Sequence, residues 1–231
     1  MLLKGLQKLT LLDYPGKIAC TVFAGGCNFR CPFCHNASLV IGERLRESAT
    51  LPEEEFFDFL NKRRGRLEGV CVSGGEPTLS PDILPFLYNI KQLGYLVKLD
   101  TNGYRPEILK KAVGEGLVDY VAMDIKSSRE SYGNAVGIEN FDVSPISESV
   151  EFLMGGGVEF EFRTTLVREL HRDAEILSIG EWIAGAPRYF LQTFVDSGDL
   201  ISSQFSGYDK NETEYLLKLL KTTVPNAQIR G

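Results

Sequence analysis

Residues 27–34 read CNFRCPFC and contain three of the chain's five cysteines, in the spacing C-x3-C-x2-C. Thiolates this close together on one loop can bind a single soft metal centre. Cys27, Cys31 and Cys34 are therefore the candidate metal ligands. Three ligands with no obvious fourth cysteine leave one coordination position open. On an iron–sulfur cluster, such a position is where a small molecule can bind and react.

Two other uses of these cysteines have to be weighed. A structural zinc site usually takes a second ligand pair from elsewhere, which the chain lacks, and His35 directly follows Cys34, whereas adjacent side chains seldom reach the same metal. Disulfides are disfavoured because an acidic chain without a signal peptide indicates a reducing cytoplasm. Cys20 and Cys71 lie in apolar runs, so we interpret them as small buried hydrophobic residues.

Length and composition bound the architecture and the partners. The 231 residues are 43% hydrophobic, which suffices for one sizeable core, so we expect one domain over residues 1–231, with a core at 17–195 and a C-terminal extension at 196–231. The net charge is −6 and no basic stripe indicates nucleic-acid binding. The run Lys62-Arg63-Arg64-Gly65-Arg66 is interpreted as a solvated helix end, with a docking patch for an acidic partner as the alternative.

The N-terminal sequence has neither the apolar core nor the small-residue cleavage site of a signal peptide. No stretch approaches the apolar length needed to cross a bilayer. We therefore expect a soluble cytoplasmic protein with no membrane partner.

Short β-rich apolar runs alternate with helix-length segments, which predicts repeated βα units around a parallel sheet. Residues 1–16 and 127–142 are expected to be irregular, apart from a turn at 13–16, and residues 227–230 could add a short edge strand. Six units are too few to close an eight-stranded barrel, so the fold class is α/β, a partial (β/α)6 TIM-like barrel whose open side could admit a large substrate. We expect strands at 17–24, 69–72, 95–99, 118–123, 158–166 and 188–195, and helices at 52–62, 81–93, 106–113, 144–155, 173–184 and 212–221.

Polar motifs follow four successive strands. In parallel α/β folds, the carboxyl ends of the strands form the edge where ligands bind. The plain alternatives are a tight βα turn for the glycine pair and helix capping for the two aspartates. The four motifs are the cysteine loop after Gly25-Gly26, then Ser73-Gly74-Gly75-Glu76-Pro77, Asp100-Thr101-Asn102-Gly103 and Asp124-Ile125-Lys126.

The cysteine spacing, with an aromatic residue before the last cysteine, resembles the cluster loop of the radical S-adenosylmethionine (SAM) enzymes. The longer phrase LDYPGKIACTVFAGGCNFRCPFCHN, residues 12–36, resembles the glycyl-radical-enzyme activases, above all the anaerobic ribonucleoside-triphosphate reductase activating proteins. The pyruvate formate-lyase activating enzymes are similar. The resemblance is strongest in this phrase and weakest after Asp196.

The resemblance implies one [4Fe-4S] cluster on Cys27, Cys31 and Cys34, with SAM on its open iron. It implies that the turn after the second strand contacts the SAM amino group, mostly through backbone. Phe33 is expected near the adenine, with loop packing as the alternative, and the backbone of the two residues after Cys34 could also meet the adenine. The residues implied in SAM binding are Phe33, His35, Asn36, Gly74, Gly75 and Glu76.

The resemblance also assigns the polar residues of later strands. Asp100, Thr101 and Asp124 are implied to hold a monovalent cation against the SAM carboxylate. Arg163 resembles the family's arginine that pairs with this carboxylate, and an outer-face salt bridge is the alternative. Lys126 would lie nearby, with its role open between acid, electrostatic anchor and supporting group.

Two expectations concern histidine. A family histidine that contacts the SAM sugar or base is replaced here by residues 192–194, Gln-Thr-Phe, so this contact stays open, although an aromatic ring could stack there. The lone His171 is expected at the surface or at a helix cap.

The function implied is that of an activase. SAM is reductively cleaved, and the 5′-deoxyadenosyl radical installs a glycyl radical on anaerobic ribonucleotide reductase. Because no cysteine-rich insert lies between Asn36 and Leu67, the electron is expected from a flavodoxin or ferredoxin. The alternatives are another glycyl radical enzyme of the formate-lyase type, a small-molecule substrate as in the 7-carboxy-7-deazaguanine synthases, or a zinc-stabilised binding module.

Overall fold

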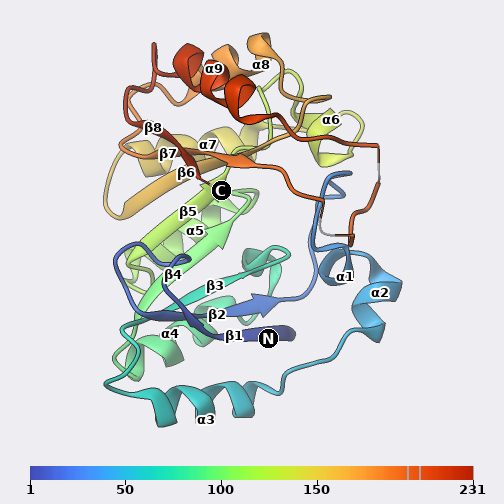
Figure 1. Ribbon diagram of the computed structural model, residues 1–231. Helices are drawn as coiled ribbons and strands as arrows, with labels where there is room; N and C mark the ends of the chain where they lie inside the picture. The colour runs from blue at the N-terminus through green and yellow to red at the C-terminus, as the bar shows by residue number, and fades with distance from the viewer. Residues whose placement is uncertain (197, 203, 231) are drawn as a thin grey trace.

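Apolar strands form the centre of the molecule, a curved sheet in which the described strands follow one another in sequence order from β1 to β8 (Figure 1). The computed structural model describes residues 1–196, 198–202 and 204–230. The strands are β1 Leu3–Thr10, β2 Ala19–Ala24, β3 Gly69–Gly74, β4 Leu96–Thr101, β5 Tyr120–Asp124, β6 Glu159–Leu166, β7 Tyr189–Thr193 and β8 Ala227–Arg230.

Helices connect the strands and pack on the outer side of the sheet, with α1 and α2 beside the mouth of the barrel (Figure 1). Within the described residues, β2 to β8 are mutually parallel, and β8 does not pair back to β1. The partial TIM-like barrel predicted from the sequence is therefore confirmed. The helices are α1 Ala37–Val40, α2 Gly42–Glu47, α3 Glu53–Arg63, α4 Ile83–Gln92, α5 Pro106–Gly114, α6 Tyr132–Val136, α7 Ser144–Met154, α8 Asp173–Trp182 and α9 Lys210–Leu220.

The strand register brings the predicted polar motifs to one edge of the sheet. Ala24 of β2 lies opposite Gly74 of β3, and Asp124 of β5 lies opposite Arg163 of β6. Because side chains alternate between the two faces of a strand, Glu161, Arg163 and Thr165 share one face of β6. Arg163 and Thr165 line the barrel cavity, which places this face inward.

Two expectations about irregular segments are wrong. The N-terminal segment contains β1, which pairs antiparallel with β2 and extends the sheet beyond the six predicted strands. Its apolar residues do not alternate regularly, and only the tertiary pairing reveals the strand. Residues 132–136 form the short helix α6, which Gly137 ends in a left-handed conformation at φ 69°. The optional strand at 227–230 is confirmed as β8.

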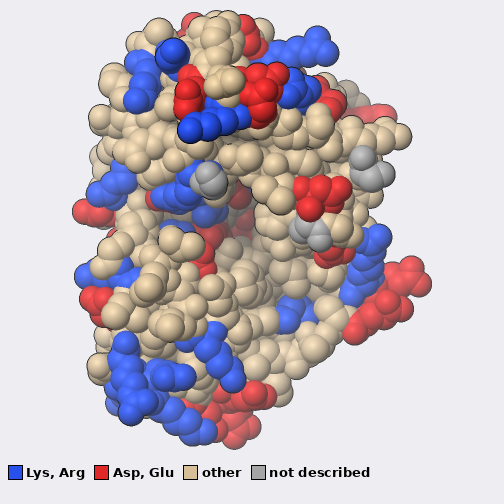
Figure 2. All heavy atoms as spheres, in the orientation of Figure 1, with Lys and Arg blue, Asp and Glu red and all other residues tan. Residues whose placement is uncertain are grey.

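The basic run at 62–66 ends helix α3, as predicted. Lys62 and Arg63 occupy the last turn of α3, and Arg64 and Arg66 are exposed just after it. Figure 2 shows Lys and Arg side chains gathered beside α3. Cations are favourable at a helix C-terminus, so this placement needs no ligand. In the described part of the chain, no helix has both the length and the hydrophobicity to cross a membrane.

A buried carboxylate ties the last strand to the barrel interior. Glu161 of β6 is 0% exposed, and it accepts hydrogen bonds from Tyr120 Oη at 2.9 Å and from Arg230 Nη1 and Nη2 at 2.6 and 3.0 Å. The Arg230 guanidinium also lies 3.6 Å from the centre of the Phe190 ring. A buried carboxylate is stable only when it is paired and hydrogen-bonded, so the short β8 is held by charge as well as by backbone.

We expect Arg230→Ala to destabilise the fold by about 2 kcal/mol, because it leaves Glu161 buried with one neutral partner. The control is Lys221→Ala, which removes an exposed charge after α9 and should change stability by less than about 0.5 kcal/mol. Urea denaturation of both variants measures the difference. Equal effects would show that Arg230 contributes only as a surface charge.

Candidate active site

A cavity of about 280 Å³ opens at the carboxyl ends of the strands and brings the predicted site residues together. Figure 2 shows a recess in the middle of this face, with acidic and basic side chains around it. All but one of the site residues predicted from the sequence line the cavity, and Glu76 is the exception. Those that line it are Cys27, Phe33, Cys31, Cys34, His35, Asn36, Gly74, Gly75, Asp100, Thr101, Asp124, Lys126 and Arg163.

The cysteine loop leaves the end of β2 and presents all three predicted thiols to the cavity. A tight turn links Cys34 N–H to Cys31 C=O at 2.9 Å, and Phe29 N–H donates to Cys27 Sγ at 3.4 Å. Burial raises the pKa of the Cys27 thiol to about 11 and that of Cys31 to about 12. A metal centre that binds these thiols therefore has to displace their protons.

The thiols are free, and in the described residues no three His, Cys, Asp or Glu side chains surround a point that could hold one metal ion. Cysteine thiolates close together on one loop are usual ligands of iron–sulfur clusters, so the donor set fits such a cluster. Cys20 and Cys71 are fully buried, as predicted.

Gly74 and Gly75 allow the turn after β3 to touch the cysteine loop. A Cβ on Gly74 would lie 2.3 Å from the Ala24 carbonyl oxygen, and one on Gly75 would lie 2.1 Å from that of Gly26. The N–H groups of Gly75 and Glu76 donate to these two carbonyls at 2.9 and 2.8 Å. These two N–H groups are therefore not free to donate to a ligand, and a ligand amino group at this turn would have to meet its carbonyl oxygens.

Glu76 does not line the cavity, and its side chain instead connects two neighbouring loops of the site. Its carboxylate is 2% exposed and accepts from the N–H groups of Thr78 and Asn102 at 3.1 and 2.5 Å. It also accepts from the hydroxyls of Thr78 and Thr101 at 2.5 and 2.8 Å. Burial raises the pKa of Glu76 above its ordinary value, although these hydrogen bonds act in the opposite direction. The side chain thus joins the turn after β3 to the end of β4.

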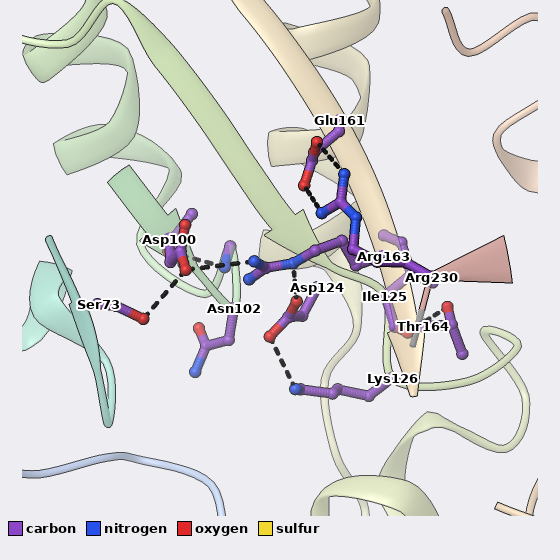
Figure 3. Close-up of polar contacts among 12 residues, drawn as sticks. Ser73, Asp100, Asn102, Asp124, Ile125, Lys126, Glu161, Arg163, Thr164 and Arg230 are labelled. Carbon is purple, nitrogen blue, oxygen red and sulfur yellow. Dashed lines mark hydrogen bonds and ion pairs between the residues drawn. The ribbon is translucent and has the colours of Figure 1, made fainter. Parts of the chain in front are cut away.

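Charged side chains from β4, β5 and β6 form one wall of the cavity (Figure 3). Arg163 lies between two carboxylates, with Nε 2.8 Å from Asp124 Oδ1 and Nη1 3.2 Å from Asp100 Oδ2. Burial alone would raise the pKa of Asp100, but the Arg163 guanidinium and the Lys98 ammonium hold it well below its usual range. Arg163 therefore faces inward, which excludes the outer-face salt bridge.

Lys126 completes this wall through its ammonium, which lies 3.0 Å from Asp124 Oδ2. Burial would lower its pKa, but the attraction of Asp124 outweighs this effect and raises the pKa above the ordinary value. A lysine held protonated in this way is a poor general base. Of residues 192–194, only Gln192 lines the cavity, whereas Phe194 is packed in the core.

His171 lies in the interior beside the cavity, which the sequence did not predict. It is 0% exposed, so the expectation of a surface or capping residue is wrong. Val167 N–H donates to its Nδ1 at 2.9 Å, so Nε2 carries the proton and donates to the Lys126 carbonyl at 2.8 Å. The ring also meets Phe33 edge-on with 6.4 Å between centres. It therefore fixes both the Lys126 backbone and one ring of the cavity.

The chain after β7 returns to the cysteine loop, which the sequence also did not reveal. Ser202 N–H donates to the Pro32 carbonyl at 2.9 Å, and Ser38 N–H donates to Asp199 Oδ2 at 3.0 Å. Asp199 also pairs with Arg44 at 3.1 Å. These contacts attach residues 199–202 to the cysteine loop, to α1 and to α2. No local pattern indicates them, because the partners lie more than 150 residues apart.

A sequence model of the family "Radical SAM superfamily" matches residues 21–178, and the chain therefore belongs to this superfamily. Its members use a [4Fe-4S] cluster and SAM. The chain is 30% identical to a Methanocaldococcus jannaschii protein named "Putative glycyl-radical enzyme activating enzyme", covering 99% of this chain and 95% of that protein.

Other relatives broaden the range of chemistry found on similar sequences. The "7-carboxy-7-deazaguanine synthase" of Koribacter versatilis is 27% identical, covering 72% of this chain and 70% of that protein. The "Pyruvate formate-lyase-activating enzyme" of Streptococcus mutans is 29% identical, covering 79% and 72%. Among solved structures, Streptococcus suis SuiB bound to precursor peptide SuiA superposes with a TM-score of 0.69 at 15% identity, covering 90% of this chain and 47% of that one, which supports the fold alone.

Gly75→Ala is expected to displace the cysteine loop, because the new methyl group would overlap the Gly26 carbonyl. Overpacking of this kind costs about 1 to 3 kcal/mol. Gly114→Ala is the matched control, since nothing lies within 4 Å of its Cβ position and alanine favours a helix. We expect lower iron content after reconstitution and a lower melting temperature for Gly75→Ala only. Normal iron content in Gly75→Ala would contradict the proposed loop contact.

His171→Leu is expected to destabilise the fold by about 3 kcal/mol, because it leaves the Val167 N–H and the Lys126 carbonyl unpaired. The change should also alter the pH dependence of stability. Burial lowers the pKa of His171 in the folded state, an effect to which Lys126 adds, while the backbone bonds and Glu175 oppose it. The unfolded chain therefore binds a proton more readily, and wild-type stability should fall as the pH drops below about 6.5.

This part of the pH dependence should be missing in His171→Leu. Chemical denaturation between neutral and mildly acidic pH measures it as the difference between the two proteins. Parallel pH profiles for wild type and variant would mean that His171 does not titrate as its contacts require.

Proposed function

We propose that this chain is a radical SAM activase that installs a glycyl radical on a partner enzyme, anaerobic ribonucleotide reductase. The observation that carries the proposal is the convergence of three motifs on one cavity. Three free cysteines, a glycine turn packed against their loop and an inward-facing arginine line the same space, and they come from β2, β3 and β6. These are the groups needed to bind a cluster, an amino group and a carboxylate.

The residues fit the two cofactors by their chemistry. Cys27, Cys31 and Cys34 would hold the iron, and soft thiolates are its usual protein ligands. The carbonyl groups of Gly74 and Gly75 would accept from the SAM amino group. Arg163 would bind the carboxylate, for which its planar fork is suited. Phe33 and the backbone of His35 and Asn36 would lie against the adenine. Lys126 would neutralise Asp124 in the wall of the cavity.

When bound, a reduced [4Fe-4S] cluster would give one electron to SAM, and breakage of a C–S bond would yield methionine and a 5′-deoxyadenosyl radical able to take a hydrogen atom from a glycine Cα. The protein's part is to position the ligands and exclude water. The cavity walls do this with rigid groups. Phe33 packs on His171 and Phe205, while Phe29 packs edge-on against Tyr104 at 5.8 Å and against Phe141 at 5.4 Å.

The reductase is proposed as partner because of the phrase at residues 12–36, and the near-complete coverage of the archaeal relative supports the activase class. We propose a flavodoxin or ferredoxin as electron donor and the cytoplasm as location. A glycyl radical enzyme of the formate-lyase type is the alternative partner. A small molecule is a second candidate substrate, which the similarity to the deazaguanine synthase favours.

The first test is anaerobic reconstitution of the cluster, followed by dithionite and SAM, with 5′-deoxyadenosine quantified. We expect 5′-deoxyadenosine that depends on dithionite, and a glycyl radical signal in electron paramagnetic resonance once the reductase is added. A well-reconstituted cluster that never cleaves SAM would overturn the proposal. SAM cleavage that produces a radical on no glycyl radical enzyme would instead favour the small-molecule candidate.

Cys31→Ala should lose the cluster and all SAM cleavage, and Cys20→Ala is the matched control. Both cysteines are buried, but Cys20 lies within β2 and outside the cavity. Four irons per chain in Cys31→Ala would contradict the ligand assignment, whereas loss of the cluster in Cys20→Ala would point to a folding effect.

A further inference from the structure

We propose that the guanidinium of Arg163 takes the place of a metal cation between Asp100 and Asp124, so that this chain binds SAM without a monovalent cation. The inference deepens the proposed function and rests on it, since the ligand is the SAM carboxylate. The sequence resemblance implied a cation held by Asp100, Thr101 and Asp124. The contacts of these residues instead favour a site in which protein cations fill that role.

Arg163 bridges the two carboxylates directly (Figure 3). Its Nε and Nη1 lie 2.8 Å from Asp124 Oδ1 and 3.2 Å from Asp100 Oδ2, and its side chain is only 12% exposed. Each carboxylate thus gives an oxygen to the same guanidinium, at the position between β4 and β5 that a shared metal ion would need. A planar, always-charged group fixed by two ion pairs is a rigid substitute for such an ion.

The remaining oxygens of the proposed cation ligands also have protein partners. Asp100 Oδ1 pairs with Lys98 and lies 3.6 Å from the Cys71 thiol, and Asp100 Oδ2 accepts from Ser73 Oγ at 3.0 Å. Asp124 Oδ2 pairs with Lys126 at 3.0 Å. Every oxygen of the two carboxylates therefore already faces a protein cation, and a metal ion would have to approach against that positive charge.

The Thr101 hydroxyl is engaged as well. It donates to Glu76 Oε1 at 2.8 Å and accepts from Gly103 N–H at 3.1 Å. One acceptor lone pair of the hydroxyl is thus taken by a backbone N–H. All three residues that the resemblance named are therefore engaged by protein partners.

The local charge points the same way. The carboxylates of Asp100 and Asp124 face three buried or half-buried cations, Lys98, Arg163 and Lys126, which leaves one positive charge in excess. The nearby Glu161 does not change this excess, because Arg230 neutralises it. In a site of low dielectric, a further cation would be repelled and an anion attracted. One carboxylate, such as that of SAM, balances this excess.

Arg163 can still bind that carboxylate after bridging the aspartates. A guanidinium has five N–H donors, and the two ion pairs use one on Nε and one on Nη1. The other donors lie on the same plane, and Arg163 lines the cavity. The residue therefore both replaces the cation and supplies the fork that orients the SAM carboxylate.

The test compares sodium, potassium and choline chloride at equal ionic strength. SAM affinity of the reconstituted wild type, measured by equilibrium dialysis, is expected to agree among the three salts within about twofold. Arg163→Met should weaken SAM binding about tenfold or more. The variant should also gain a response that wild type lacks. Its melting temperature, measured without SAM, should rise in sodium or potassium relative to choline, because a cation now binds the freed carboxylates of the folded state.

Arg168→Met is the matched control, because Arg168 pairs with Glu212 outside the cavity. The melting temperature of this variant should be the same in the three salts. Arg163→Lys keeps a charge and should stay insensitive to sodium and potassium even if Arg163→Met fails to fold. Tighter SAM binding or a higher melting temperature of wild type in sodium or potassium would overturn the inference. No SAM binding in any salt would overturn the proposed function, while the melting temperatures would still decide the role of Arg163.

Discussion

The site depends on a backbone contact between two loops that follow neighbouring strands. The carbonyls of Ala24 and Gly26 accept hydrogen bonds from Gly75 and Glu76, so the cysteine loop and the glycine turn form one unit. Only glycine permits this approach, because a Cβ would overlap the carbonyl oxygens. The position of the thiols relative to the rest of the cavity is therefore set by main chain, before any metal or ligand is bound.

Buried polar groups connect this loop contact to the later strands of the sheet. Glu76 joins the glycine turn to Thr101 and Asn102 at the end of β4. Asp100, one residue before Thr101, pairs with Arg163 of β6, and Arg163 pairs with Asp124 of β5. Each link is a hydrogen-bonded carboxylate that is buried or mostly buried, where an unpaired partner is costly. The fold and the site are consequently stabilised by the same interactions.

The sequence could predict the barrel and most of the cavity because both follow from local pattern. Apolar runs located the parallel strands, and the polar motifs after them had to share one edge. The sequence could not place β1 or α6, whose formation depends on tertiary contacts. It also missed His171 and the return of residues 199–202 to the cysteine loop, since both depend on partners far away in sequence. The sequence placed Glu76 in the turn beside the site, but it did not show that its side chain binds Thr78, Thr101 and Asn102 and does not line the cavity.

The barrel interior also explains why such a small fold can bury so many charges. Lys98, Asp100, Arg163, Asp124 and Lys126 alternate in sign, so each ion meets an opposite charge on at least one side. A second group, Glu161 with Arg230 and Tyr120, satisfies the next inward position of β6 below Arg163. Paired in this way, the charges are costly to separate, and they hold their geometry better than a solvated set would. The cavity therefore has rigid charged donors on the wall formed by β4, β5 and β6, and it is also lined by the glycine turn after β3.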